Sequence, residues 1–232
     1  MDINTFFRSF RPHNTSVPIM EKLRSGFAAG IAIFILGLAL KYLPHNSYPF
    51  LMLGSMAASA TLLYAVPHSP MTQPWNLIGG HLISALFAWP CIVFIHDPVI
   101  AAAVAVGGAI FVMHYLNCLH PPGAATALTL VLGSTMFLNH GWEWTLLVVV
   151  INAFIFLVLA LVLNNLLPGR CYPMQQMPLT PLKPSAHLTL EILDIEYALE
   201  QMDSVIDVSE KDLVKIYELA LLHARKRDFQ TL

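Results

Sequence analysis

The sequence predicts an all-α membrane protein, a polytopic helix bundle with four to six spanning segments and a soluble helical tail. Composition is the first reason, because 11% of the residues are charged and 56% are hydrophobic, whereas ordinary soluble domains are about 25% charged. The second is that no lysine or arginine stands between Lys41 and Arg170. The third is a succession of apolar runs in that part of the chain, several of them long enough to cross a hydrocarbon core of roughly 30 Å.

The composition divides the chain into a surface segment, a membrane domain, a linker and a soluble tail. In chain order these parts cover residues 1–21, 22–168, 169–187 and 188–232. The surface segment is polar and aromatic. It contains no cleavable signal pattern, so the first apolar run is expected to remain as an uncleaved first span.

The first two apolar runs differ in length and composition. The first covers residues 23–42, where Gly26 and Gly30 have the spacing that permits close helix contact. The second covers residues 50–66 and is short and rich in small side chains. A proline-rich connection over residues 67–74 ends it, because proline lacks the backbone donor that a continuing helix needs.

The remaining runs alternate between long and short. The third begins at an interfacial tryptophan and contains Gly79-Gly80-His81, and Asp97-Pro98 forms the turn to the fourth. Residues 50–66 and 121–138 are the two short segments, and both are expected to be broken or re-entrant helices. In chain order, the last four runs cover residues 75–95, 99–116, 121–138 and 142–167.

Basic residues flanking the runs predict the orientation. Cytoplasmic flanks of membrane spans carry an excess of lysine and arginine. Arg8, Arg11, Lys22 and Arg24 precede the first run, and Arg170 follows the last. Both termini are therefore expected in the cytoplasm, which requires an even number of crossings. Six full crossings satisfy this, and so do four crossings with two re-entrant half-helices.

The tail is expected to form a cytoplasmic helical hairpin. One helix is predicted over residues 192–202. A second is predicted from Ser209, a good N-cap with Asp212 three residues later, to Arg227. Its apolar residues fall on one face, so the hairpin is expected to dock on the membrane domain or on another copy of the chain.

The stretch from Asn117 to Leu128 combines a polar cluster with two prolines and a glycine. Pro121 and Pro122 suit the first turn of a helix and prevent an upstream helix from continuing. A helix N-terminus carries unsatisfied N–H groups and partial positive charge, which attract anions. In a membrane, such broken backbone is tolerated where it is buried in protein or lines a water-filled cavity.

A small anion inside this domain would have no lysine or arginine to bind it. Binding would then fall to helix N-termini, hydroxyls, amides and histidines. A histidine with an ordinary pKa near 6.5 could also couple anion movement to a proton. The candidate binding residues are Gly54, Ser55, Ser59, Gln73, Asn76, His81, Asn117, His120, Pro121, Pro122, Gly123, Ala124, Ala125 and Thr126.

Structural roles compete with each of these assignments. His120 could satisfy carbonyl groups at the end of the fourth run, and His81 could make a structural hydrogen bond inside the bundle. Gly79, Gly80 and Gly123 could serve close helix packing as easily as approach to a ligand. Asp97 and Glu143, the only acids between Lys41 and Arg170, stand at segment ends and are expected to be solvated.

Enzyme and metal chemistry are not expected. The cysteines Cys91, Cys118 and Cys171 are far apart and show neither CxxC nor paired spacing. The sequence contains no HExxH, GxSxG or P-loop motif, and no GxGxxG in a strand–turn–helix setting. We therefore expect no catalytic residue, no metal, no cofactor and no nucleic-acid partner.

Two short segments share a pattern that is typical of transporter repeats. Residues 57–60 resemble residues 124–127, and each short segment lies between two longer apolar runs. Such paired, Gly/Pro-interrupted segments point to a binding site at a repeat interface. The alternative is that alanine-rich helices resemble one another by composition.

Three blocks of sequence resemble the HPP family of integral membrane proteins, which is named for its His-Pro-Pro triplet. The first is the stretch from Asn117 to Leu128. The second runs from Leu53 through Gly79-Gly80-His81 to Ala85, and the third, 207–224, is similar to the soluble tail of bacterial members. In family members this tail often leads into paired CBS modules, and nucleotide regulation through such modules is not expected here.

The resemblance implies a transporter or channel for a small inorganic anion, since relatives in photosynthetic lineages are associated with nitrite. We expect an inner-membrane protein. A homodimer or higher oligomer is expected from the small-residue faces and the tail. The competing hypothesis is a non-transporting scaffold or sensor that acts through the cytoplasmic hairpin.

Overall fold

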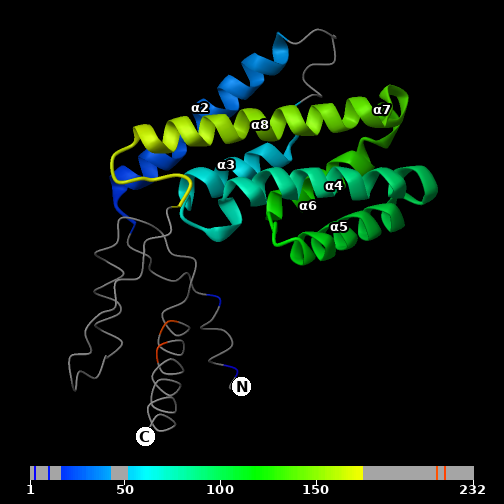
Figure 1. The fold of residues 1–232 in the computed structure, drawn as a ribbon, viewed down its shortest axis with the longest axis horizontal. Helices are drawn as coiled ribbons and strands as arrows, with labels where there is room; N and C mark the ends of the chain where they lie inside the picture. Colours follow the sequence, from blue (N-terminus) through cyan, green and yellow to red (C-terminus); the bar gives the residue numbers. More distant parts are fainter. Residues whose placement is uncertain are drawn as a thin grey trace, which may run out of the picture.

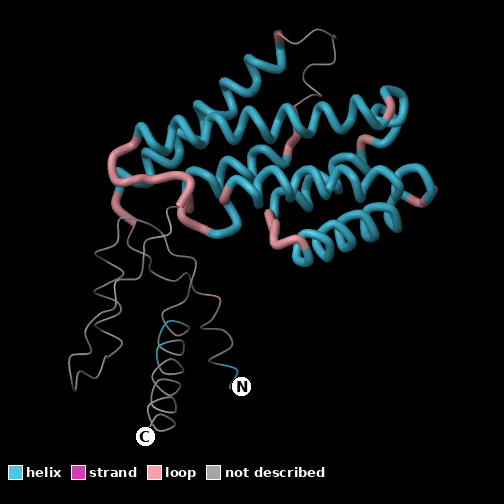
Figure 2. Tube along the Cα trace, in the orientation of Figure 1, coloured by secondary structure: helices cyan, strands magenta, loops and turns pink. Residues whose placement is uncertain are grey.

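The computed structural model describes residues 17–42 and 52–174, together with the isolated positions 3, 10, 213 and 217. Throughout these residues the secondary structure is helical and contains no strand (Figure 1; Figure 2). The elements are α2 (Ile19–Lys41), α3 (Ser55–Ala65), the short 3-10 helix η1 (Pro70–Thr72), α4 (Pro74–Phe94), α5 (Pro98–Tyr115), α6 (Pro121–Leu132), α7 (Ser134–His140) and α8 (Trp142–Leu166). The predicted surface segment before residue 17, the linker from residue 175 and the tail hairpin lie outside the described residues, apart from the isolated positions.

The all-α class and the number of spans are confirmed. Within the described residues, α2, α4, α5 and α8 are long and apolar enough to cross a membrane, and the pair α6 and α7 could supply a fifth span. Helix α3 has 11 residues. At 1.5 Å per residue it is about 17 Å long, which is short of the roughly 30 Å hydrocarbon core.

The segment predicted as one helix over 121–138 is two helices. Helices α6 and α7 meet at an angle of 81°. Gly133 lies at the junction, and a Cβ atom there would come within 2.8 Å of the Phe137 ring. The sharp turn therefore depends on the missing side chain, which lets the ring of Phe137 fold back over the chain.

Helix starts follow the proline and capping signals in the sequence. Helices α4, α5 and α6 all have proline in their first turn. The N–H groups of a first turn have no partner within the helix, so proline costs no hydrogen bond there. Asp97 caps α5, because its carboxylate accepts hydrogen bonds of 2.9 Å from the N–H groups of both Val99 and Ile100. Asp97 is exposed in this structure.

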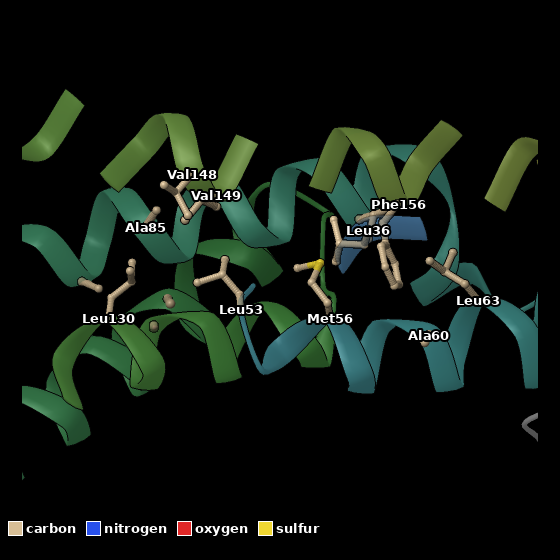
Figure 3. Packing of buried hydrophobic residues seen from close by; sticks show 14 of the residues in the cluster. Leu36, Leu53, Met56, Ala60, Leu63, Ala85, Leu130, Val148, Val149 and Phe156 are labelled. Carbon is tan, nitrogen blue, oxygen red and sulfur yellow. The ribbon is translucent and has the colours of Figure 1, made fainter. Parts of the chain in front are cut away.

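Helix α4 is the centre of the bundle and packs against α5, α6 and α8, while α2 packs against α3 and α8. The short α3 also contacts α6, so the two short helices are neighbours. Figure 3 shows the core where α2, α3 and α8 meet, with Leu36, Met56 and Phe156 pointing toward one another. Small residues such as Ala85 are buried in this core, and small side chains favour close packing of membrane helices.

A polar clamp joins the start of α2 to the segment that follows α8. The Arg170 guanidinium bonds to the Glu21 carboxylate, to the Ser25 hydroxyl at 3.0 Å and to Asn164 Oδ1 at 3.1 Å. The two ends of the described membrane domain therefore lie together, as the blue and yellow segments in Figure 1 show.

A second contact fixes the same end of the bundle. The Tyr172 hydroxyl donates to the Thr72 carbonyl at 2.8 Å, so the segment after α8 holds η1. Burial raises the pKa of Tyr172, which keeps the hydroxyl protonated as the donor.

Replacing Glu21 with glutamine tests the clamp. We expect Glu21→Gln to lower the free energy of unfolding by about 1 kcal/mol, because one charge-assisted bond to Arg170 becomes neutral. Unfolding in mixed micelles measures the change. The matched control is Glu143→Gln, at an exposed position in the first turn of α8, which should unfold like the unaltered protein. Equal unfolding of both variants would contradict a stabilising role for the clamp.

Candidate functional site

Two histidines and a serine meet inside the bundle. The Ser59 hydroxyl lies 3.0 Å from His81 Nε2 and 3.0 Å from His120 Nε2. The two imidazole rings stand edge to face with their centroids 5.1 Å apart. All three side chains are 0% exposed. A pair of imidazoles is thus held within an apolar bundle by one shared hydroxyl.

Two more hydroxyls extend this group. Thr126 Oγ1 lies 2.7 Å from His81 Nδ1 and 2.7 Å from Ser55 Oγ. At the other end, His120 Nδ1 lies 2.8 Å from the Met71 carbonyl. The five side chains of Ser55, Ser59, His81, His120 and Thr126 therefore form one continuous polar cluster, which we call the histidine–hydroxyl cluster.

Separate elements supply the members of the cluster. Ser55 and Ser59 are four residues apart on α3 and so share one face of that helix. His81 comes from α4 and Thr126 from α6. His120 stands just before α6 in an extended conformation, φ −135° and ψ 102°, which is what a following proline favours.

Two glycines let the helices come close enough to form the cluster. A Cβ atom on Gly123 would lie 2.7 Å from the carbonyl carbon and oxygen of Gly80, so α6 and α4 touch backbone to backbone. A Cβ atom on Gly80 would lie 2.5 Å from the His120 Cβ. Close packing is therefore the observed role of both glycines, and it brings His120 beside α4.

The start of α6 does not present free N–H groups at its first three positions. Pro121 and Pro122 have no N–H, and the N–H of Gly123 bonds to the His120 carbonyl at 2.7 Å. Gly123 is also covered by Gly80. Of the N–H groups after Pro122 that the sequence offers to an anion, the first one, on Gly123, is therefore occupied by a hydrogen bond and covered by helix packing.

The other candidate residues lie outside the cluster. Gln73 Nε2 donates to the carbonyls of Pro67 and Ser69, and Asn76 Nδ2 donates to the Leu119 carbonyl at 2.9 Å. These hydrogen bonds from side-chain amides to the backbone hold the chain in place around the cluster. Gly54, Asn117 and Pro121 are exposed, Ala124 and Ala125 are half-buried, and Pro122 is buried.

Sequence reasoning missed three polar groups that belong to this region. The Met71 carbonyl accepts from His120, and no side-chain pattern could have indicated a backbone partner. Ser84, one turn after His81 on α4, is 0% exposed, and its hydroxyl has no hydrogen-bond partner. Asn152 accepts from the N–H of Leu53 at 3.3 Å. An amide in the middle of the most apolar run was the available signal for Asn152.

Metal coordination finds no support in the described part of the chain. Within residues 17–42 and 52–174, no three side chains of His, Cys, Asp or Glu are grouped so that they could hold a metal ion. What the cluster offers is a set of neutral donors and acceptors. Such groups can hydrogen-bond an anion or pass a proton.

Comparison with known proteins agrees with this architecture. The family model described as "HPP, transmembrane region" matches residues 14–173. Two similar curated proteins, both from Dictyostelium discoideum and named only as transmembrane proteins, are 39% identical over 127 residues and 34% identical over 153 residues.

These matches cover 53% and 64% of this chain but 44% and 49% of the relatives, so the chain spans about half the length of the curated relatives it matches. No solved structure matches. The family model covers more than half of the chain, including all the described helices. The chain therefore belongs to the HPP family of multi-pass transmembrane proteins.

Proposed function

We propose that this protein moves a small inorganic anion across the membrane, with nitrite as the candidate substrate. The histidine–hydroxyl cluster is the observation that carries the proposal. Its five side chains are between 0% and 2% exposed and lie within apolar helices. Ionisable and polar groups at such a depth are costly and mark solute or proton pathways by default.

Charge placement supports an anion rather than a cation. The helices that supply the cluster, α3, α4 and α6, contain no Asp or Glu that could bind a cation. Hydroxyls and imidazole N–H groups are donors that can bind an anion without a fixed positive charge. A site of this kind holds its ion weakly enough to release it, which suits transport.

The packing supports a mechanism in which parts of the bundle move against each other. Helices α3 and α6 are short, they are linked by the Ser55–Thr126 bond, and α6 ends at the bend to α7. We propose that parting this contact exposes the two hydroxyls to the ion. The bundle as described is then the closed state, and no catalytic residue, metal or cofactor takes part.

Flux into protein-containing liposomes tests the function. We expect nitrite to enter liposomes containing the full chain faster than it enters empty liposomes, with nitrate and chloride compared in parallel. The assay is run at alkaline pH, because nitrous acid crosses lipid without a protein. Absence of flux for all three anions would overturn the proposal and favour the scaffold alternative.

Assembly and location complete the proposal. We propose a homo-oligomer in the inner membrane, with the small-residue faces supporting contact between copies. On α2, a Cβ atom at Gly26 or Gly30 would meet no atom within 4 Å, so this face is open for close contact. Measuring the mass of the protein in native lipid tests for the oligomer. A monomer that transports nitrite would contradict the proposed oligomer.

A further inference from the structure

We propose that the histidine–hydroxyl cluster is a proton relay whose donors at rest all point from Ser55 toward His120, and that His120 is where the proton rests. The inference rests on the proposed transport function, because it names the ion that would be coupled to the anion. It is carried by the geometry of one hydrogen-bonded chain. Each link in that chain is between 2.7 and 3.0 Å long.

The Met71 carbonyl sets the direction of the whole chain. A carbonyl can only accept, so His120 Nδ1 must carry the hydrogen of their 2.8 Å bond. Neutral His120 then has a bare Nε2, which accepts the hydrogen of the Ser59 hydroxyl. Ser59 has given away its one hydrogen, so it accepts from His81 Nε2–H. The tautomer of each imidazole follows from this network.

The same reasoning fixes the far end. With its hydrogen on Nε2, His81 has a bare Nδ1, which accepts from the Thr126 hydroxyl at 2.7 Å. Thr126 in turn accepts from the Ser55 hydroxyl. The carbonyl of Pro122 lies 3.5 Å from Thr126 Oγ1 and is the poorer acceptor. Every donor in the chain therefore points from Ser55 toward Met71.

A proton that arrives at Ser55 can pass along this chain with every bond accounted for. It binds the Ser55 oxygen, and the original Ser55 hydrogen moves to Thr126. The Thr126 hydrogen moves to His81 Nδ1, the His81 Nε2 hydrogen moves to Ser59, and the Ser59 hydrogen moves to His120 Nε2. His120 becomes an imidazolium that donates to both Ser59 and Met71, while the four links from Ser55 to His120 reverse.

Neighbouring groups leave His120 as the natural endpoint. Its Nδ1 proton cannot move on to the Met71 carbonyl, which forms no covalent bond to it. A proton held on His120 therefore leaves by the reversed chain through Ser55, at the Ser55–Thr126 contact where it would meet the anion. The elements around the chain, α3, η1, α4 and α6, contain no Asp, Glu, Lys or Arg. The other titratable side chains on these elements are Tyr64 on α3 and Cys91 on α4, and Cys118 lies against Gly79.

Position supports a functional route rather than a closed core network. Ser55 follows the exposed Gly54, and the Met71 end belongs to η1, which Tyr172 holds at the end of the bundle where Arg170 lies. The relay thus joins the N-terminal turn of α3 to one end of the bundle. A proton and an anion would meet at the Ser55–Thr126 contact.

Nitrogen-15 NMR on the full chain in lipid, without added nitrite, tests the direction. We expect His120 with hydrogen on Nδ1 and His81 with hydrogen on Nε2 at neutral pH, and His120 as the imidazole that gains a second hydrogen first on acidification. The opposite tautomers, or first protonation of His81, would overturn the relay. This measurement does not depend on any transport activity.

Ser59→Ala tests the link between the two rings. The variant removes the shared hydroxyl but leaves the His120–Met71 bond, so the His120 Nδ1–H signal reports that the fold is kept. With a pH dye inside nitrite-transporting liposomes, we expect proton uptake to fall by at least about tenfold, the factor that 1.4 kcal/mol produces. The control is Ser84→Ala, which removes a buried hydroxyl with no partner and should match the unaltered protein.

The outcomes separate the relay from the transport proposal. Nitrite flux without proton uptake in the unaltered protein would overturn the relay and keep the transporter. The expected tautomers with no flux of any anion would overturn the transporter and keep the direction of the chain. Unchanged proton uptake in Ser59→Ala would overturn the relay, because the His81–His120 link is then not needed.

Discussion

Replacing His120 with asparagine should lower nitrite flux into liposomes by at least about tenfold while the protein stays folded. The asparagine amide can still donate to the Met71 carbonyl in place of Nδ1, but its side chain is too short to reach Ser59. Ser59 then loses an acceptor in a buried site, which costs about 1–3 kcal/mol. A loss of about 1.4 kcal/mol or more within that range corresponds to at least about a tenfold loss of flux if the cluster is used in transport.

His114 provides the matched control for this variant. It is exposed in the last turn of α5, so His114→Asn removes an imidazole from the same part of the chain without touching the cluster. Flux through His114→Asn should equal that of the unaltered protein. Normal nitrite flux through His120→Asn would show that the His120 imidazole has no part in the transport mechanism.

Replacing Gly123 with alanine should destabilise the bundle by about 1–3 kcal/mol, the usual cost of forcing a methyl group into a filled core. The new Cβ would meet the Gly80 backbone at 2.7 Å, and backbone has no rotamer with which to move aside. Helices α4 and α6 must separate, which stretches the bond between His81 and Thr126. We expect a lower unfolding midpoint in mixed micelles together with reduced flux.

Gly107→Ala distinguishes this steric effect from a general effect of removing glycine. Gly107 lies within α5, and a Cβ there would meet nothing within 4 Å. Because alanine favours helix over glycine, the control should unfold at the same midpoint as the unaltered protein or slightly above it. If the two variants behave alike, the contact between α4 and α6 is not as tight as described.

The helices themselves could be predicted because their signals are local. The run expected over residues 75–95 is the helix Pro74–Phe94, and the run expected over 142–167 is Trp142–Leu166. Length and apolar character set where a span can lie, and proline sets where a helix begins. The bend between α6 and α7 was the exception, because it depends on Phe137 folding over Gly133.

The candidate site could be predicted only in part. Both histidines and the hydroxyls of Ser55, Ser59 and Thr126 were identified as polar groups in an apolar domain. Their partnership was not, because the Ser55–Thr126 bond joins positions 71 residues apart in the chain. Gln73 and Asn76 carried the same signal of a polar side chain near a helix start, yet they bind backbone carbonyls.

The sequence by itself determined a membrane bundle, the starts of its proline-led helices and a short list of polar residues, since each of these follows from the composition and spacing of nearby residues. Only the tertiary structure decided which of those residues meet. Two glycines on different helices let α4 and α6 touch, and that contact covers the first N–H group of α6 while placing His120 beside α4. A one-dimensional pattern contains no information on how closely two backbones approach, and that distance decides whether the helix start or the side chains can receive an ion.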